Sequence, residues 1–127
     1  MIKIGWCKKD VSTDEPIIIP GQFYVRYSKG VMDPIMASVL TIDDGDDYAI
    51  FVTVDVVTIL KDVLLAVRKR VAVLNPQIDT EKIIMNCTHT HAGPLVLNSD
   101  DLGGWGRLED LPHDGIEITS PVKYFAY

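Results

Sequence analysis

The sequence lacks long apolar runs, has few cysteines and carries no extended basic cluster. A membrane-crossing helix needs about 20 consecutive apolar residues, so no membrane span is predicted. Cys7 and Cys87 are too few for a disulfide framework, and the sequence leaves open whether they meet. The 12 lysines and arginines are outnumbered by 18 acidic residues, which gives a net charge of -6. Because phosphate binding needs a clustered basic surface, nucleic acid is not an expected partner.

The beginning of the chain, MIKIGWCKKD, lacks the long apolar segment of a secretory signal. If Met1 is the natural start, the predicted location is the cytoplasm. With 127 residues, 47% of them hydrophobic, the chain can bury a core without disulfides or metal. A helix is predicted to begin at Ser120-Pro121, yet the sequence stops about two turns later. We therefore expect residues 1–127 to form either a single domain or the N-terminal fragment of a larger catalytic domain.

Hydrophobic periodicity predicts an α/β fold. Apolar and β-branched runs indicate strands, and an i, i+3, i+4, i+7 pattern indicates a helix that ends before Asn75-Pro76. The expected strands cover 2–8, 35–43, 48–57 and 82–87, and the expected helix covers 60–74. Strand, helix and strand form a βαβ crossover, whose two strands run parallel. The sheet is thus predicted to be mixed, and Val63, Leu64, Val67 and Val71 should pack the helix on it.

Two long segments contain closely spaced glycines and prolines. Residues 10–34 are expected to form an irregular loop, and a loop of that length in a compact domain suggests a function. Residues 92–118 are also expected to be loop. The run Arg68-Lys69-Arg70 is expected to lie mostly on the solvent side of the helix.

Two histidines stand one residue apart after the fourth predicted strand, in NCTHTHAGP. Residues i and i+2 of an extended backbone point to one face, so His89 and His91 should project together. Ligands of open α/β sheets collect at the carboxyl ends of strands, and imidazole is a common zinc ligand. Thr90 should face away, and Gly93 should permit a close backbone approach. The pair alone supports equally a metal or catalytic role and two hydrogen-bonded structural histidines.

Four further residues are weaker candidates. Asp55 ends a predicted strand, where its carboxylate could support a ligating histidine or form a local cap. Arg26 could reach a polar or anionic substrate group or lie solvated in a loop. Cys87 could join the histidines in a metal site or be a buried thiol. His113, in LPHDG, is expected at the surface.

The motif THTHAGP after an apolar strand resembles the THTHSGP signature of neutral/alkaline, non-lysosomal ceramidases and their bacterial relatives. The resemblance covers most of the chain. KKDVSTDEPIIIPG is similar to an A-D-I-T-P-like start, RYSKGVMDPIMASVLTIDDG to G-V-x-D-P-L-x-A-R-A-L-V-L-D-x-G, and FVTVDVV to a strand ending in S-L-D-L. The first motif is degraded at Ser12-Thr13, Ser38 replaces the arginine, and Leu95-Val96 replace the SGPGG continuation. Because that continuation lies near the site in the family, this last departure leaves a polar or smaller amide open as the substrate in place of ceramide.

The resemblance implies zinc-dependent hydrolysis of an amide bond. His89 matches a zinc ligand, and His91 matches a residue that hydrogen-bonds the substrate or the tetrahedral intermediate. Zinc polarises the amide carbonyl and lowers the pKa of bound water to about 7. In the family the remaining ligands, a histidine, a glutamate and a tyrosine, come from beyond the first motif. Zinc is therefore expected in the full-length protein, with the remainder of the catalytic domain as partner and a small or lipid-like amide as substrate.

Two other functions remain open. In one, the chain is a non-catalytic relative whose histidines only form hydrogen bonds. In the other, the pair serves a metal-dependent ester or phosphoester hydrolase. Apolar surface left where the remainder of the domain packs should favour self-association.

Overall fold

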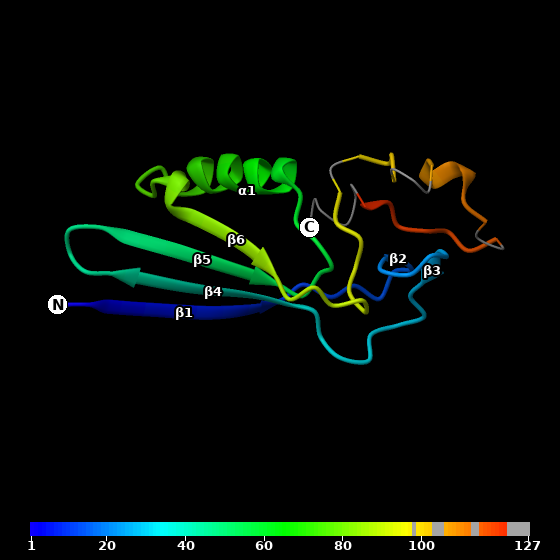
Figure 1. Ribbon diagram of the computed structural model, residues 1–127, viewed down its shortest axis with the longest axis horizontal. Helices are drawn as coiled ribbons and strands as arrows, with labels where there is room; N and C mark the ends of the chain where they lie inside the picture. The colour runs from blue at the N-terminus through cyan, green and yellow to red at the C-terminus, as the bar shows by residue number, and fades with distance from the viewer. Residues whose placement is uncertain (98, 103–105, 113–114, 122–127) are drawn as a thin grey trace.

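The computed structural model describes residues 1–97, 99–102, 106–112 and 115–121. Its main element is a four-stranded sheet in the order β1-β4-β5-β6 (Figure 1). These strands are β1 (Lys3–Asp10), β4 (Met36–Asp43), β5 (Tyr48–Val54) and β6 (Ile83–Cys87). β4 pairs antiparallel with both β1 and β5, whereas β5 and β6 run parallel. The predicted mixed α/β sheet with a βαβ crossover is therefore confirmed.

The hairpin between β4 and β5 forms where the sequence places it. Asp44 N donates to Asp47 O at 3.1 Å, and Gly45 takes a φ of 101°, which favours glycine. β5 ends three residues earlier than predicted, because the chain bends at Asp55 and leaves the sheet. A short 3₁₀ helix, η1 (Thr80–Lys82), leads into β6.

The crossover helix is α1 (Lys61–Leu74), which matches the predicted 60–74 and lies beside β6 in Figure 1. Its packing on the sheet is looser than expected. Val63 is buried with 3% of its surface exposed, but Leu64, Val67 and Val71 are only half-buried. A cavity of about 660 Å³ opens between helix and sheet, lined by Val67 and by sheet residues such as Val52. No helix in the described part of the chain is long and apolar enough to cross a membrane.

The basic run of the helix is only partly solvent-facing. Lys69 and Arg70 are exposed as predicted. Arg68 instead folds back on the start of β6, where its Nη2 donates to Ile83 O at 2.9 Å and its Nη1 pairs with Glu81 at 2.7 Å. Through these two contacts Arg68 joins the helix to the sheet.

The segment predicted as an irregular loop, 10–34, contains a small hairpin. β2 (Ile18–Ile19) and β3 (Arg26–Tyr27) pair antiparallel beyond the carboxyl ends of β5 and β6 (Figure 1). Ile18 of this hairpin is buried in a hydrophobic core cluster with Leu102 and Leu111, which come from the segment predicted as loop after the histidines. That later segment also holds the 3₁₀ helix η3 (Leu108–Asp110). The helix predicted from Ser120-Pro121 falls mostly outside the described residues.

Candidate functional site

The two histidines follow the paired carboxyl ends of β5 and β6. Val54 and Cys87 are aligned as the last pair of the ladder, and Thr88 N extends the pairing with a 3.1 Å bond to Val54 O. His89 then takes a φ of 58°, in the left-handed region. For a residue with a Cβ, that conformation costs about 1–2 kcal/mol. The expectation of an extended backbone through the pair is therefore wrong at His89. The centroids of the two imidazole rings still lie only 5.1 Å apart.

The imidazole of His89 is oriented by a backbone carbonyl. Its Nδ1 lies 2.6 Å from Val57 O, on the segment that leads into α1. A carbonyl only accepts hydrogen bonds, so we assign the proton to Nδ1. In the neutral ring, Nε2 then keeps its lone pair on an exposed side chain. Metal-ligating histidines are held in this way, with the second ring nitrogen donating to a carbonyl or carboxylate.

Cys87 is engaged with the same carbonyl. Its Sγ donates to Val57 O at 3.5 Å, and the side chain is half-buried. Within the described residues, no group of three or more histidine, cysteine, aspartate or glutamate side chains is placed to hold a metal ion. The donor set therefore fits a metal only in part, with one oriented imidazole and a second ring beside it.

His91 is positioned by two residues of the 10–34 segment. Arg26 Nη2 donates to His91 O at 2.6 Å and to Pro20 O at 3.2 Å. Gly21, at a φ of 96°, lies against the ring. A Cβ on this residue would be 2.5 Å from His91 Cγ and 2.6 Å from Nδ1. Thus Arg26 ties the β2–β3 hairpin to the histidine loop, and Gly21 provides the space for the imidazole.

Asp55 supports the backbone at this end of the sheet. Its Oδ2 accepts from Met36 N at 3.0 Å, and its own N–H donates to Met36 O at 3.0 Å. Gly93 approaches so closely that a Cβ there would lie 2.3 Å from Asp55 O. The close approach predicted for Gly93 is confirmed. The Asp55 carboxylate has the geometry of a local cap.

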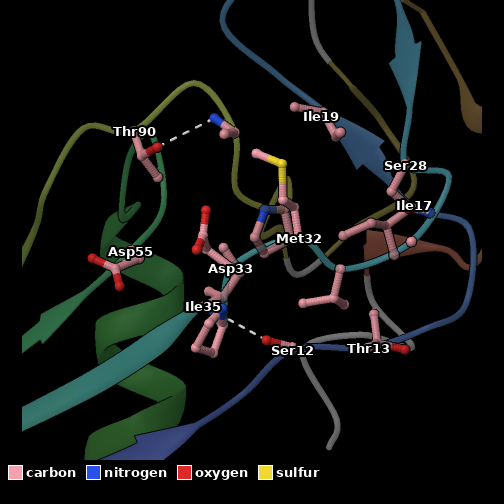
Figure 2. A pocket seen from close by; sticks show the side chains of 15 residues that line it. Ser12, Thr13, Ile17, Ile19, Ser28, Met32, Asp33, Ile35, Asp55 and Thr90 are labelled. Atoms are coloured by element: carbon pink, nitrogen blue, oxygen red, sulfur yellow. Dashed lines mark hydrogen bonds between the residues drawn. The ribbon is translucent and has the colours of Figure 1, made fainter.

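A cavity of about 350 Å³ lies beside the histidine loop (Figure 2). Thr90 lines it, as expected for a residue that faces away from the histidine pair. Its Oγ1 accepts from Ala92 N at 3.2 Å. Neither histidine ring lines the cavity. Residues with hydroxyl or carboxyl side chains line it from several segments, namely Ser12, Thr13, Ser28, Asp33, Asp55 and Thr90.

Apolar side chains, among them Ile17, Ile19 and Ile35, form the rest of the cavity wall. Small-molecule sites are commonly apolar hollows of about 300–1,000 Å³ with a few convergent polar groups. This cavity fits that description. His113, expected at the surface, lies outside the described residues.

Sequence reasoning found the histidines but did not predict how Arg26 and Gly21 position them. Arg26 was a candidate for substrate contact, and its guanidinium instead holds two backbone carbonyls. Gly21 follows Pro20 in a segment rich in glycine and proline. That composition indicates a turn, but it does not predict that the ring of His91 packs against Gly21.

The fold is similar to part of a known hydrolase. No family model and no curated protein matches the sequence. Among solved structures, the crystal structure of neutral ceramidase from Pseudomonas aeruginosa matches with a TM-score of 0.65 and 22% sequence identity. The match covers 73% of this chain and 16% of that chain. The chain therefore has a ceramidase-like fold and spans a small part of the length of that enzyme.

Proposed function

We propose that this chain is the N-terminal, histidine-bearing portion of a ceramidase-like zinc amidohydrolase. The observation that carries the proposal is the bond between His89 Nδ1 and Val57 O, which leaves Nε2 free for a metal. The ceramidase-like fold and the THTHAGP motif at the carboxyl end of a parallel strand support it. The substrate class is an amide, either a small molecule or a lipid-like one.

His89 is the proposed zinc ligand of this portion. When bound, zinc would supply Lewis acidity and an activated water for amide hydrolysis. Because the described residues offer no complete ligand set, the other ligands are proposed to come from the remainder of the catalytic domain. We therefore expect residues 1–127 alone to show little or no amide hydrolysis.

His91 is proposed to hydrogen-bond the substrate carbonyl or the tetrahedral intermediate. Such a donor is effective only when it is held in place before the reaction. Here Arg26 fixes the backbone of His91, and Gly21 allows the ring to settle against the hairpin. The hydroxyl-lined cavity beside Thr90 offers room for polar groups of the substrate.

A non-catalytic role is the competing hypothesis, and one observation favours it. The carbonyl bond of His89 and the contact between the two rings already give the histidines partners without any ligand. Zinc binding and turnover separate the two hypotheses, because a structural pair affects neither except through stability.

The test is a zinc titration beside an amidase rate assay in the protein that carries the remaining ligands. His89→Ala should weaken zinc binding by about 10-fold or more, since losing even an outer partner of a ligand costs about 10–100-fold. His91→Ala should retain zinc and slow turnover by about 10²–10³, as for a lost oxyanion donor. His113→Ala, which removes the third histidine of the chain, is the matched control and should change neither measurement.

Two outcomes would contradict the proposal. If His91→Ala loses zinc while His89→Ala keeps it, the two roles are exchanged. If both variants bind zinc and turn over normally, the pair is structural and the proposed activity is wrong.

A further inference from the structure

The cavity beside the histidine loop is formed by several segments of this chain. It lies where the segment after β1, the β2–β3 hairpin, the approach to β4, the end of β5 and the histidine loop meet (Figure 2). Its volume of about 350 Å³ equals that of about a dozen water molecules at about 30 Å³ each. The cavity therefore has room for a group of about the size of a monosaccharide.

Two threonine hydroxyls of the cavity have a hydrogen to donate. Thr90 Oγ1 accepts from Ala92 N at 3.2 Å, and Thr13 Oγ1 accepts from Glu15 N at 3.1 Å. A hydroxyl carries one donor beside its acceptor positions, and neither of these O–H groups has an acceptor within the part of the chain that the structure describes. The Ser28 hydroxyl differs, because it already reaches Glu15 O at 3.5 Å. A ligand in the cavity is thus offered two O–H donors.

The cavity also offers carboxylate oxygens and lacks a cationic group. Asp33 is exposed and has no hydrogen bond or ion pair among the described residues. Asp55 is half-buried and uses Oδ2 to accept from Met36 N at 3.0 Å, so that Oδ1 is left for a ligand. None of the described residues that line the cavity is a lysine, an arginine or a histidine. Because carboxylates only accept hydrogen bonds, they require donors on a ligand.

We propose that the cavity binds a neutral, hydroxyl-rich group of the substrate, of the class of a monosaccharide or a similar polyol. A hydroxyl both donates and accepts, so such a group satisfies the threonine donors and the aspartate acceptors together. An ammonium group has no acceptor for the threonines. A carboxylate group has no donor for the aspartates and is repelled by their charge. The apolar wall, which includes Ile17, Ile19 and Ile35, suits the C–H faces of a polyol ring.

The position of the cavity places this group next to the reacting bond and not at it. Thr90 and Ala92, the chain neighbours of His91, line the cavity, whereas neither histidine ring does. Asp33 and Thr90 are therefore specificity-determining residues and not catalytic ones. The assignment of the polyol to the substrate rests on the proposed function, but binding of a polyol in the cavity does not.

The first test is an NMR titration of the 127-residue chain with methyl β-glucoside. We expect saturable shifts of the amide resonances of Ala92 and Glu15, whose N–H groups donate to the two threonines. Gluconate and cyclohexylamine, an anionic and a cationic probe of similar size, should bind at least about 10-fold more weakly. Asp33→Ala should weaken glucoside binding by about 10-fold, because hydrogen bonds to a charged acceptor are the stronger ones. Asp46→Ala, at an exposed position of the β4–β5 turn, is the matched control and should leave binding unchanged.

A second pair of variants tests the hydroxyl donor. Thr90→Val keeps the shape of the side chain and removes the hydroxyl, so it should also weaken glucoside binding, with its circular dichroism unchanged. Thr88→Val is its control, because Thr88 is exposed on the same loop and does not line the cavity. In the protein that carries the remaining zinc ligands, methyl β-glucoside should inhibit amide hydrolysis competitively, and about 10-fold less strongly in Asp33→Ala.

The outcomes separate this inference from the proposed function. A chain that shows no saturable glucoside binding, or that binds the three probes equally, overturns the polyol site, while the variants of His89 and His91 still decide the amidase activity. Equal weakening by Asp33→Ala and Asp46→Ala overturns it as well. Glucoside binding without competitive inhibition of an active amidase overturns the assignment of the polyol to the substrate and leaves the proposed function intact.

Discussion

Replacing Gly21 by alanine tests whether the hairpin positions His91. Gly21 has a φ of 96°, and a Cβ there would meet His91 Cγ at 2.5 Å and His91 Cβ at 3.1 Å. These are the atoms nearest the histidine backbone, so the ring cannot move aside by a simple rotation of its tip. The backbone of His91 is itself held by Arg26 at 2.6 Å. The substitution must therefore displace either the hairpin or the histidine loop.

The expected loss of stability has two parts. A residue with a Cβ in this backbone region costs about 1–3 kcal/mol whatever surrounds it. Overfilling a packed contact costs a further 1–3 kcal/mol or so. Gly45 separates the two parts, because its φ is 101° and a Cβ there meets nothing within 4 Å. Gly45→Ala should thus show only the backbone part, and Gly21→Ala should be less stable than Gly45→Ala by about 1–3 kcal/mol.

Urea unfolding of the two variants measures the difference in free energy of unfolding. The imidazole resonances of His91, followed by NMR, report its environment directly. They should shift in Gly21→Ala and stay unchanged in Gly45→Ala. Equal stability of the two variants, or unchanged His91 resonances in Gly21→Ala, would refute the positioning of His91 by the hairpin.

Two further predictions concern the sheet and its connections. Val63→Asp should remove the roughly 1.5–3 kcal/mol by which burial of the valine side chain stabilises the fold, and it also buries an unpaired charge. The circular dichroism of this variant should therefore show a largely unfolded chain. Val73→Asp, on an exposed position of the same helix, should change stability by less than about 0.5 kcal/mol, and similar losses in both would contradict the packing of α1. The hydrogen bond from Lys82 holds the pKa of Asp47 below its ordinary value of 3.8, so its stabilising effect is present above about pH 4 and is lost as pH falls through the lowered pKa. The thermal unfolding midpoint of Asp47→Asn should accordingly vary less below about pH 4 than that of the parent chain, and an identical profile would show that the pair does not stabilise the fold.

Local sequence patterns predicted most of the secondary structure. Alternating β-branched residues marked the strands, and the helical spacing of Val63, Val67 and Val71 marked α1. Asn75-Pro76 ended the helix where proline forbids its continuation. Each of these signals depends on neighbours within a few positions, which is why the sequence alone was sufficient. The histidine motif was also recognisable from the sequence alone. The parallel pairing of β5 and β6 placed it at the carboxyl ends of these strands, as expected.

Contacts between distant residues decided the rest. The left-handed turn at His89 and its bond to Val57, 32 positions earlier, assigned the free nitrogen of the ring. The bond from Arg26 to the carbonyl of His91 spans 65 positions. Both faces of the sheet carry apolar side chains, and only the placement of α1 showed which of them the described residues leave exposed. Periodicity sets which residues share a face, but what meets that face depends on where the chain returns in space, and no local pattern contains that information.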